Sequence, residues 1–501
     1  MLSVKGLLSG AGWSGRRQRR ETNVKQSIFS ALRFYNYRLF WLGQLVSVTG
    51  TFMQSTAQQW LVLTLTSSPV ALGIVGALQF GPMLIPLGGA VADRFPRRNV
   101  LIVTQAAAGM LAFILFLLTI THAVQLWHVY TLAFMLGIVN SVDMPTRQAF
   151  VSEMVPRENL LNAVSLNSAQ FNASRIVGPG IAGALIALFG VPPLFLLNAI
   201  SFIAVIAGLA LMHTSELIPV PRRVGDERGQ IQALSDGVRF VWSNPKLRVT
   251  FLMVGVIGTL GFNFNVLVPL EAHQTLHAGP AAFGLLTSSL GVGALAGALL
   301  LARRGGQPTN KWLAGMGAAF GLLLSSLLLA HTVQQAMVVM ALIGFAMSSF
   351  SASANTRVQL ASPPEIRGRV MSVYSMVFVG TTPFGNLIVS GLASSTGSVP
   401  LSFALSGLPC FLVALVAAYL WSRQPATGEQ PASATAGEFL PPTLEGGDTP
   451  PNALSVAPAL PVEDTASHRS AADRPHASLA GRILPRTPGQ PKLQPRAADH
   501  E

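Results

Sequence analysis

Residues 99–121 read NVLIVTQAAAGMLAFILFLLTIT, an apolar run without a charged side chain, and the two residues before it are Arg97 and Arg98. About 20 consecutive apolar residues are needed to cross the roughly 30 Å hydrocarbon core of a bilayer. The run therefore predicts a transmembrane helix, and it places the arginine pair in the loop that precedes this helix.

The composition of the whole chain points the same way. Of the 501 residues, 50% are hydrophobic and only 11% are charged, whereas a soluble globular domain carries about 25% charged residues. The net charge is +13, but Lys and Arg gather between apolar runs, so we interpret them as topology signals and expect no nucleic-acid partner. Cys410 is the one cysteine, which excludes an intrachain disulfide and a cysteine-based metal site.

Further apolar runs of similar length extend from Leu39 to Ser422. They predict an all-α membrane protein with twelve transmembrane helices, arranged as two pseudo-symmetric six-helix bundles in a lipid bilayer. The expected helices cover residues 39–65, 72–92, 99–121, 126–143, 163–188, 192–212, 249–270, 281–302, 310–330, 333–352, 371–394 and 400–422.

The loops between these runs test the helix count independently. Odd-numbered loops, such as residues 66–71 and 121–125, contain no Lys or Arg. Even-numbered loops carry the cations, which are Arg94, Arg97 and Arg98; Arg147 and Arg157; those from Arg222 to Arg248; Arg303, Arg304 and Lys311; and Arg357, Arg367 and Arg369. Because cytoplasmic loops hold the positive charge, we expect a multi-pass protein of the inner membrane with both termini in the cytoplasm.

The remaining segments complete the expected domain organisation. Residues 1–38 form a basic N-terminal segment, residues 39–213 and 249–422 the two bundles, and residues 214–248 a central cytoplasmic loop. Apolar residues recur in that loop at helical spacing and favour an interfacial amphipathic helix over a solvated linker. Residues 423–501 are rich in Pro, Ala and Ser without an apolar period, which predicts a disordered cytoplasmic tail.

An internal repeat supports the division into bundles. The segment from Asp143 through Thr146-Arg147 into the fifth helix has a counterpart from Asn355-Thr356-Arg357 into the eleventh. Two six-helix repeats in the same orientation place a substrate path between them, near the bilayer midplane.

Residues 89–98 then read Gly89-Ala-Val-Ala-Asp93-Arg94-Phe-Pro-Arg97-Arg98. This stretch resembles the signature of the major facilitator superfamily in the loop between its second and third helices, with Pro96 where glycine is usual. The motif suggests a conformational latch in which charges pair across the bundle and release in another state. The simpler alternative is that the arginines only fix topology.

The resemblance narrows to one exporter subgroup at residues 144–183, from Pro145-Thr-Arg-Gln-Ala to Gly178-Pro179. This region, and the opening around Arg38, look like enterobactin exporters and macrolide efflux proteins, which are drug–proton antiporters. The resemblance implies outward, ion-coupled transport. The chain departs from it by lacking an arginine in the fourth helix and by having Ala182-Gly183 where a glycine pair is common.

Several polar residues within the apolar runs are candidates for the substrate or ion pathway. Arg175 shares a helix face with Ser168 and Asn172, and it would either attract an anionic group or bond backbone carbonyls near Gly178 and Pro179. The other candidates either line a path or form interhelical hydrogen bonds; they are Gln44, Thr51, Gln54, Gln58, Asn263, Asn265, Ser375 and Asn386.

Two further sets complete the candidate residues. Gly178, Pro179, Gly183 and Pro383 form a predicted helix-break motif. Asp143 and Glu271 are the candidate proton carriers, although each is better interpreted as a charge at a helix end.

The residues favour a two-half secondary transporter, and the resemblance implies a proton-coupled exporter of small amphipathic compounds such as a drug or a siderophore-like metabolite. A nucleotide-binding loop is absent from the sequence, so we expect the proton gradient as energy source and no cofactor, metal or catalytic residues. The alternatives are an importer or uniporter of the same fold, an intramembrane enzyme, and a non-transporting scaffold or sensor. We expect a monomer.

Overall fold

The computed structural model describes residues 29–84, 91, 94–218, 227–304 and 307–423. Within these ranges every regular element is a helix. The N-terminal segment up to residue 28, the latch residues Gly89 and Asp93, and the tail after residue 423 lie outside the described residues, so the predictions made for them stay predictions.

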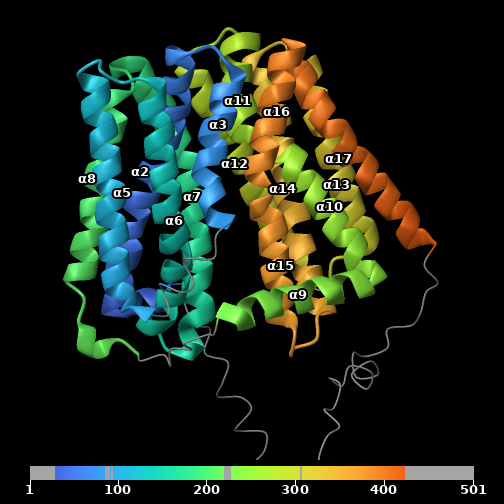
Figure 1. The fold of residues 1–501 in the computed structure, drawn as a ribbon, viewed down its shortest axis with the longest axis horizontal. Helices are drawn as coiled ribbons and strands as arrows, with labels where there is room; N and C mark the ends of the chain where they lie inside the picture. The colour runs from blue at the N-terminus through green and yellow to red at the C-terminus, as the bar shows by residue number, and fades with distance from the viewer. Residues whose placement is uncertain (1–28, 85–90, 92–93, 219–226, 305–306, 424–501) are drawn as a thin grey trace, which may run out of the picture. The chain divides into compact units, whose positions relative to one another are not determined.

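The helices fall in chain order into two groups (Figure 1). The first group consists of α2 (Tyr35–Leu65), α3 (Pro69–Phe80) continued by η2 (Gly81–Leu84), α5 (Arg97–Ile120), α6 (Leu126–Met154), α7 (Arg157–Phe189) and α8 (Pro192–Ala210). The second consists of α10 (Pro245–Gly261), α11 (Phe264–Leu270), the π-helical η4 (Glu271–Thr275), α12 (Pro280–Arg304), α13 (Asn310–Ser326), η5 (Leu327–Leu329), α14 (Val333–Ala361), α15 (Arg367–Gly380), α16 (Thr382–Thr396) and α17 (Val399–Ser422).

Proline starts many of these helices. Pro69, Pro192, Pro245 and Pro280 each occupy the first position of their helix. The fixed backbone angle of proline suits that position, and the N–H that it lacks would have no partner in the first turn.

Nine helical segments in the described part of the chain are long and apolar enough to cross a membrane. The described parts of the other three predicted ranges are also helical, as α2, α3 with η2, and α6. These three contain many polar residues or end where the description ends. The prediction of an all-helical membrane protein is therefore confirmed, and the count of twelve spans stays a prediction.

The sequence placed several helix ends wrongly. The fourth predicted helix ended at residue 143, but α6 continues to Met154, and the tenth ended at residue 352, but α14 continues to Ala361. Hydropathy marks only the apolar part of a helix, whereas the backbone hydrogen bonds continue through polar turns beyond it. Most of the polar segment between the fourth and fifth runs is therefore helix.

The helix-break motif is also only partly right. α7 runs without interruption through Gly178 and Pro179, so the predicted break is wrong there. Proline removes one backbone hydrogen bond and bends a helix, yet α7 continues beyond Pro179 to Phe189. In the eleventh predicted helix the break is present, because α15 ends at Gly380 and α16 begins at Thr382, one residue before Pro383.

Each group packs mainly within itself, and the two groups meet mainly along two helix pairs, with smaller contacts of α11 on α2 and α3. In the first group α8 packs on α2 and α5, and in the second α14 packs on α12 and α13. Between the groups, α7 packs on α12 and α3 packs on α16. The central loop contributes η3 (Thr214–Glu216) and α9 (Glu227–Ser243), and α9 packs on α15 through an ion pair between Asp236 and Arg369 (2.7 Å).

Candidate functional site

We call the end of the helices that carries Arg97, Arg157 and Arg367 the cationic end, and the other the opposite end. The two helix groups touch closely toward the opposite end. A Cβ atom placed on Gly183 of α7 would lie 2.6 Å from the carbonyl oxygen of Pro280 and 3.0 Å from the Cα of Gly284. Glycine is therefore required for the α7–α12 contact, because any side chain would push the helices apart.

Polar and aromatic groups extend this closure. The Trp60 ring lies against His273 and Phe283, with ring centroids 5.6 and 6.2 Å apart. Gln274 donates from Nε2 to the Ser67 carbonyl (3.0 Å). Ser288 of α12 also donates to the Ile176 carbonyl of α7 (2.7 Å), near the middle of both helices. Among the described residues, every hydrogen bond or ring contact between the groups lies either there or at the opposite end.

The exposure pattern of α7 shows where the groups separate. In the second half of α7, Ala173, Val177, Ile181 and Leu188 form an exposed apolar face, whereas Ala163, Leu166 and Gln170 at the same angle in the first half are buried. A second face contains Ser168, Asn172 and Arg175, the α7 stripe, and it is at least partly exposed only as far as Arg175.

Beyond Arg175 the same face becomes buried. Gly178 packs beside Phe52 and the Thr49 carbonyl of α2, and Gly183 packs on α12. This face of α7 points toward the second group at the opposite end, where the two groups touch. Toward the cationic end, where the two groups separate, the same face therefore points into the space between them. The α7 stripe therefore lines a gap that opens toward the cationic end, and Arg175 lies at its inner limit.

The repeat produces the same arrangement in the second group. The second group has a matching set of residues on α15 and α16, which we call the α15–α16 stripe: Ser375, Val379 and Thr382. They follow Ser168, Asn172 and Arg175 at a constant offset in the sequence, and all three are partly or fully exposed. Beyond them Gly385 and Asn386 are buried. The gap thus has two equivalent walls, and only the first group's wall ends in a cation.

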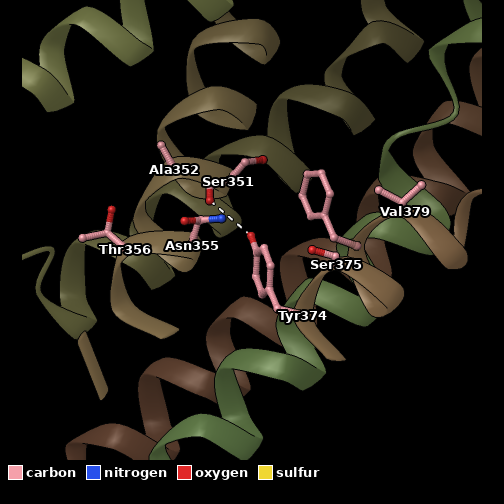
Figure 2. A pocket seen from close by; sticks show the side chains of 8 residues that line it. Ser351, Ala352, Asn355, Thr356, Tyr374, Ser375 and Val379 are labelled. Atoms are coloured by element: carbon pink, nitrogen blue, oxygen red, sulfur yellow. Dashed lines mark hydrogen bonds between the residues drawn. The ribbon is translucent and has the colours of Figure 1, made fainter. Parts of the chain in front are cut away.

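A cavity of about 470 Å³ indents the second wall (Figure 2). Its residues come from α14 and α15, and the Tyr374 hydroxyl donates across it to the Ser351 carbonyl (3.3 Å). Tyr374 and Phe378 stack with centroids 5.8 Å apart and planes at 16°. Asn355 and Ser375 add polar groups, so the cavity offers an aromatic surface beside hydrogen-bonding side chains.

Arg175 has no hydrogen bond or ion pair with any described residue, although it is half-buried near the middle of a long helix. Its own carbonyl lacks the usual helical donor, because Pro179 has no N–H. The guanidinium does not bond carbonyls near Gly178 and Pro179. The alternative that Arg175 serves only to bond backbone carbonyls at this point of α7 therefore gains no support.

Asp143 belongs to a compact polar cluster instead. Its Oδ1 accepts hydrogen bonds from Thr104 Oγ1 and Gln105 Nε2, both at 2.7 Å, and its Oδ2 pairs with Arg147 one turn away. Arg147 also donates to Gln44 Oε1, so the cluster joins α2, α5 and α6. The carboxylate is compensated on both oxygens.

Glu271 has a different environment. Its side chain is completely buried in η4, and neither carboxyl oxygen has a hydrogen-bond partner in the described part of the chain. Among the described residues no cation pairs with it.

Most of the other candidates form contacts within or between neighbouring helices. Gln54 accepts from Asn198 Nδ2 (2.7 Å), which joins α2 to α8, and Asn263 donates to the Thr259 carbonyl (2.6 Å). Asn265 accepts from Gln59 (3.4 Å) between the groups. Of the remainder, Thr51, Ser168 and Asn172 bond carbonyls one turn back, while Gln58 and Asn386 are buried.

The described latch arginines bond within the first group. Arg97 pairs with Glu153 of α6 at 2.8 Å, and Arg98 donates to the carbonyls of Leu209 and Ala210 at the end of α8 (2.7 and 3.1 Å). A cation is favourable there because the last carbonyls of a helix lack internal partners. Arg94 is exposed. A latch between the bundles stays a prediction.

Sequence reasoning missed Thr104, Gln105 and Tyr374, and it treated Arg147 only as a loop charge. The i, i+4 spacing of Asp143 and Arg147 is a signal for a helical ion pair, but hydropathy ends the fourth predicted helix at Asp143 and leaves Arg147 in the loop. No sequence pattern indicated that Tyr374 and Phe378 would stack beside α14.

Comparison with known proteins agrees with this geometry. The family described as "Transmembrane secretion effector" matches residues 26–446. The chain belongs to this family, which is part of the major facilitator superfamily, and it is a secondary transporter of small molecules.

Three curated relatives align over most of their length. They are the staphyloferrin A transporter of Staphylococcus aureus (strain NCTC 8325 / PS 47), 25% identical over 76% of this chain and 94% of the relative; the multidrug efflux pump Tap of Mycolicibacterium fortuitum, 27% over 75% and 93%; and the enterobactin exporter EntS of Shigella flexneri, 24% over 76% and 90%. The predicted resemblance to exporters of this superfamily is confirmed.

Solved structures share the fold. The POT family transporter PepTSo has a TM-score of 0.61 at 15% identity, covering 77% of this chain and 97% of that one. A bacterial homologue of the human lysosomal transporter Spinster has a TM-score of 0.57 at 14% identity, covering 78% and 96%.

Proposed function

We propose that this protein exports small amphipathic compounds across the inner membrane by alternating access. The two equivalent walls, closed together at one end and separate at the other, are the observation that carries this proposal. Such a gap between two repeats is where secondary transporters bind substrate. In this proposal the helices form twelve spans in two six-helix bundles, embedded in lipid as a monomer.

The positive-inside rule supplies the orientation. If the cationic end and both termini face the cytoplasm, the gap opens inward and the Gly183–Gly284 contact closes the outer side. This is the state in which an exporter would accept substrate from the cell. The names of the staphyloferrin A, Tap and enterobactin relatives support a siderophore-like or drug-like cargo.

A proton gradient is the proposed energy source, without a cofactor. Glu271 is the better candidate for the proton carrier, because its carboxyl is buried without a cation. Asp143 already has Arg147, Thr104 and Gln105 as partners. A buried carboxyl without a cation is costly when ionised, so gain and loss of a proton would favour different states.

Cellular accumulation tests the direction of transport. Deleting the gene should increase accumulation of at least one compound in a panel of drugs and siderophores, and an uncoupler should reproduce that increase in cells that retain the gene. Reintroducing the gene should reverse it. Decreased accumulation on deletion would indicate an importer, and no change across the panel would contradict transport of these classes.

A further inference from the structure

The charged residues in the interior of the helices differ in whether they have partners. Asp143 and Arg147 neutralise each other, and the Arg357 guanidinium lies over the Trp421 ring at 5.1 Å. Glu271 is completely covered by protein. Arg175 alone combines partial exposure with the lack of an ion pair, hydrogen bond or ring contact among the described residues.

The position of Arg175 makes this lack of a partner unusual. At 1.5 Å per residue, it lies roughly 27 Å from the cationic end of α7 and 21 Å from the other end. A cation at that depth is costly unless it is paired or faces a water-filled cavity, and for this reason it commonly marks a substrate or ion path.

Three features show that Arg175 faces the gap. It continues the polar α7 stripe, and it lies on the face that contacts α2 and α12 only one turn further on. It also lies opposite in angle to Val177 and Ile181 on the apolar face. The equivalent position of the second wall holds uncharged Thr382, so nothing in the repeat requires a cation here.

The rest of the gap carries no competing anion among the described residues. The second wall presents Ser375, Asn355 and the stacked rings of Tyr374 and Phe378. Such a wall suits an aromatic or amide-rich body, and a guanidinium suits a carboxylate, which it can bind through two parallel hydrogen bonds.

We propose that Arg175 binds the acidic group of the transported compound, so that the cargo class is amphipathic anions that join a carboxylate to an aromatic body. This deepens the proposed function and rests on it. A neutral analogue of the same shape should bind more weakly, and a cation weaker still, because nothing described in the gap would neutralise it.

Dansylglycine and dansylglycinamide test the proposal, because they share one fluorescent ring system and differ in a carboxylate or an uncharged amide. Binding to the purified full-length protein is followed by dansyl fluorescence. We expect the wild type to bind the acid about tenfold more tightly or better, as a charge-assisted hydrogen bond provides. Arg175→Gln should remove this preference, and Arg175→Lys should keep part of it.

Arg357→Gln is the matched control, since it also removes a helical arginine, but one that is occupied by Trp421. It should keep the preference for the acid. Thermal unfolding of each variant shows whether it is folded. Equal affinities in the wild type, a preference that survives in Arg175→Gln, or binding of neither probe up to millimolar concentration would overturn the proposal.

This binding assay does not depend on the direction or energy source of transport. A failed charge preference would therefore leave the exporter proposal standing, and a failed accumulation assay would leave the charge preference measurable.

Discussion

At the residue scale, the two interior acids show how surroundings decide the role of the same chemical group. Asp143 has an arginine and two neutral donors, whereas neither carboxyl oxygen of Glu271 has a hydrogen-bond partner among the described residues. The Asp143 cluster joins α2, α5 and α6 through hydrogen bonds and an ion pair on both carboxylate oxygens.

The ion pair in this cluster predicts an asymmetric response to substitution. Arg147→Gln leaves a carboxylate that is 3% exposed without a cation, whereas Asp143→Asn leaves an arginine that is 29% exposed and can reach water. Because breaking a buried pair costs about 3–5 kcal/mol, we expect Arg147→Gln to lower the free energy of unfolding by about 3 kcal/mol, and Asp143→Asn by less.

Unfolding in mixed micelles measures both variants and the double variant. The double variant Asp143→Asn/Arg147→Gln should be more stable than Arg147→Gln alone, because it leaves no uncompensated charge. Additive losses would contradict a coupled pair.

At the element scale, the sequence predicted the helices well and their contacts poorly. Apolar runs and alternating loop charges located α5, α12 and α17, because both signals are local along the chain. They could not show that Gln54 bonds Asn198, or that Arg97 and Arg98 bond within their own group, because those partners depend on how distant helices pack.

The same limit applies to the candidate site. Helical spacing grouped Ser168, Asn172 and Arg175 correctly, but Thr51, Gln54 and Gln58 share one sequence stripe and differ in exposure. The local rule that proline interrupts a helix failed at Pro179, where packing against α2 and α12 preserves α7.

The glycine contact between α7 and α12 gives the prediction at this scale. Gly284→Val should destabilise the state closed at the opposite end, since a Cβ atom at Gly284 would meet the Cα of Gly183 at 3.0 Å. Overpacking costs about 1–3 kcal/mol. If this free-energy cost falls only on the state closed at the opposite end, it should shift the ratio of that state to the state open there by about fivefold to 150-fold.

Labelling of Ser168→Cys by a membrane-impermeant maleimide in inside-out vesicles measures that shift, in a Cys410→Ser background. Gly284→Val should slow the labelling in proportion to the population that leaves the state closed at the opposite end. Gly315→Val is the matched control, because no atom lies within 4 Å of a Cβ placed there, and it should label like the parent. Unchanged labelling in Gly284→Val would mean that this contact does not hold the conformation.

At the scale of the whole molecule, the transport cycle requires the closed end to open. His273 and Gln274 make cross-group contacts with Trp60 and Ser67, and they belong to the same π-helical turn as Glu271. A charge on the buried Glu271 would destabilise this turn in its present packing. The chain thus links a titratable carboxyl to the contacts that close the opposite end.

The prediction is that Glu271→Gln separates movement of substrate from use of the proton gradient. In proteoliposomes, the variant should exchange labelled for unlabelled substrate at a rate near the wild type, because glutamine resembles the protonated acid and permits closure. Accumulation driven by an imposed proton gradient should fall about tenfold or more, since no proton can be carried at this position. Glu216→Gln, which removes an exposed acid on η3, should keep both activities. Full gradient-driven accumulation by Glu271→Gln would place the proton carrier elsewhere, whereas loss of exchange as well would mean that the carboxylate is needed for conformational change itself.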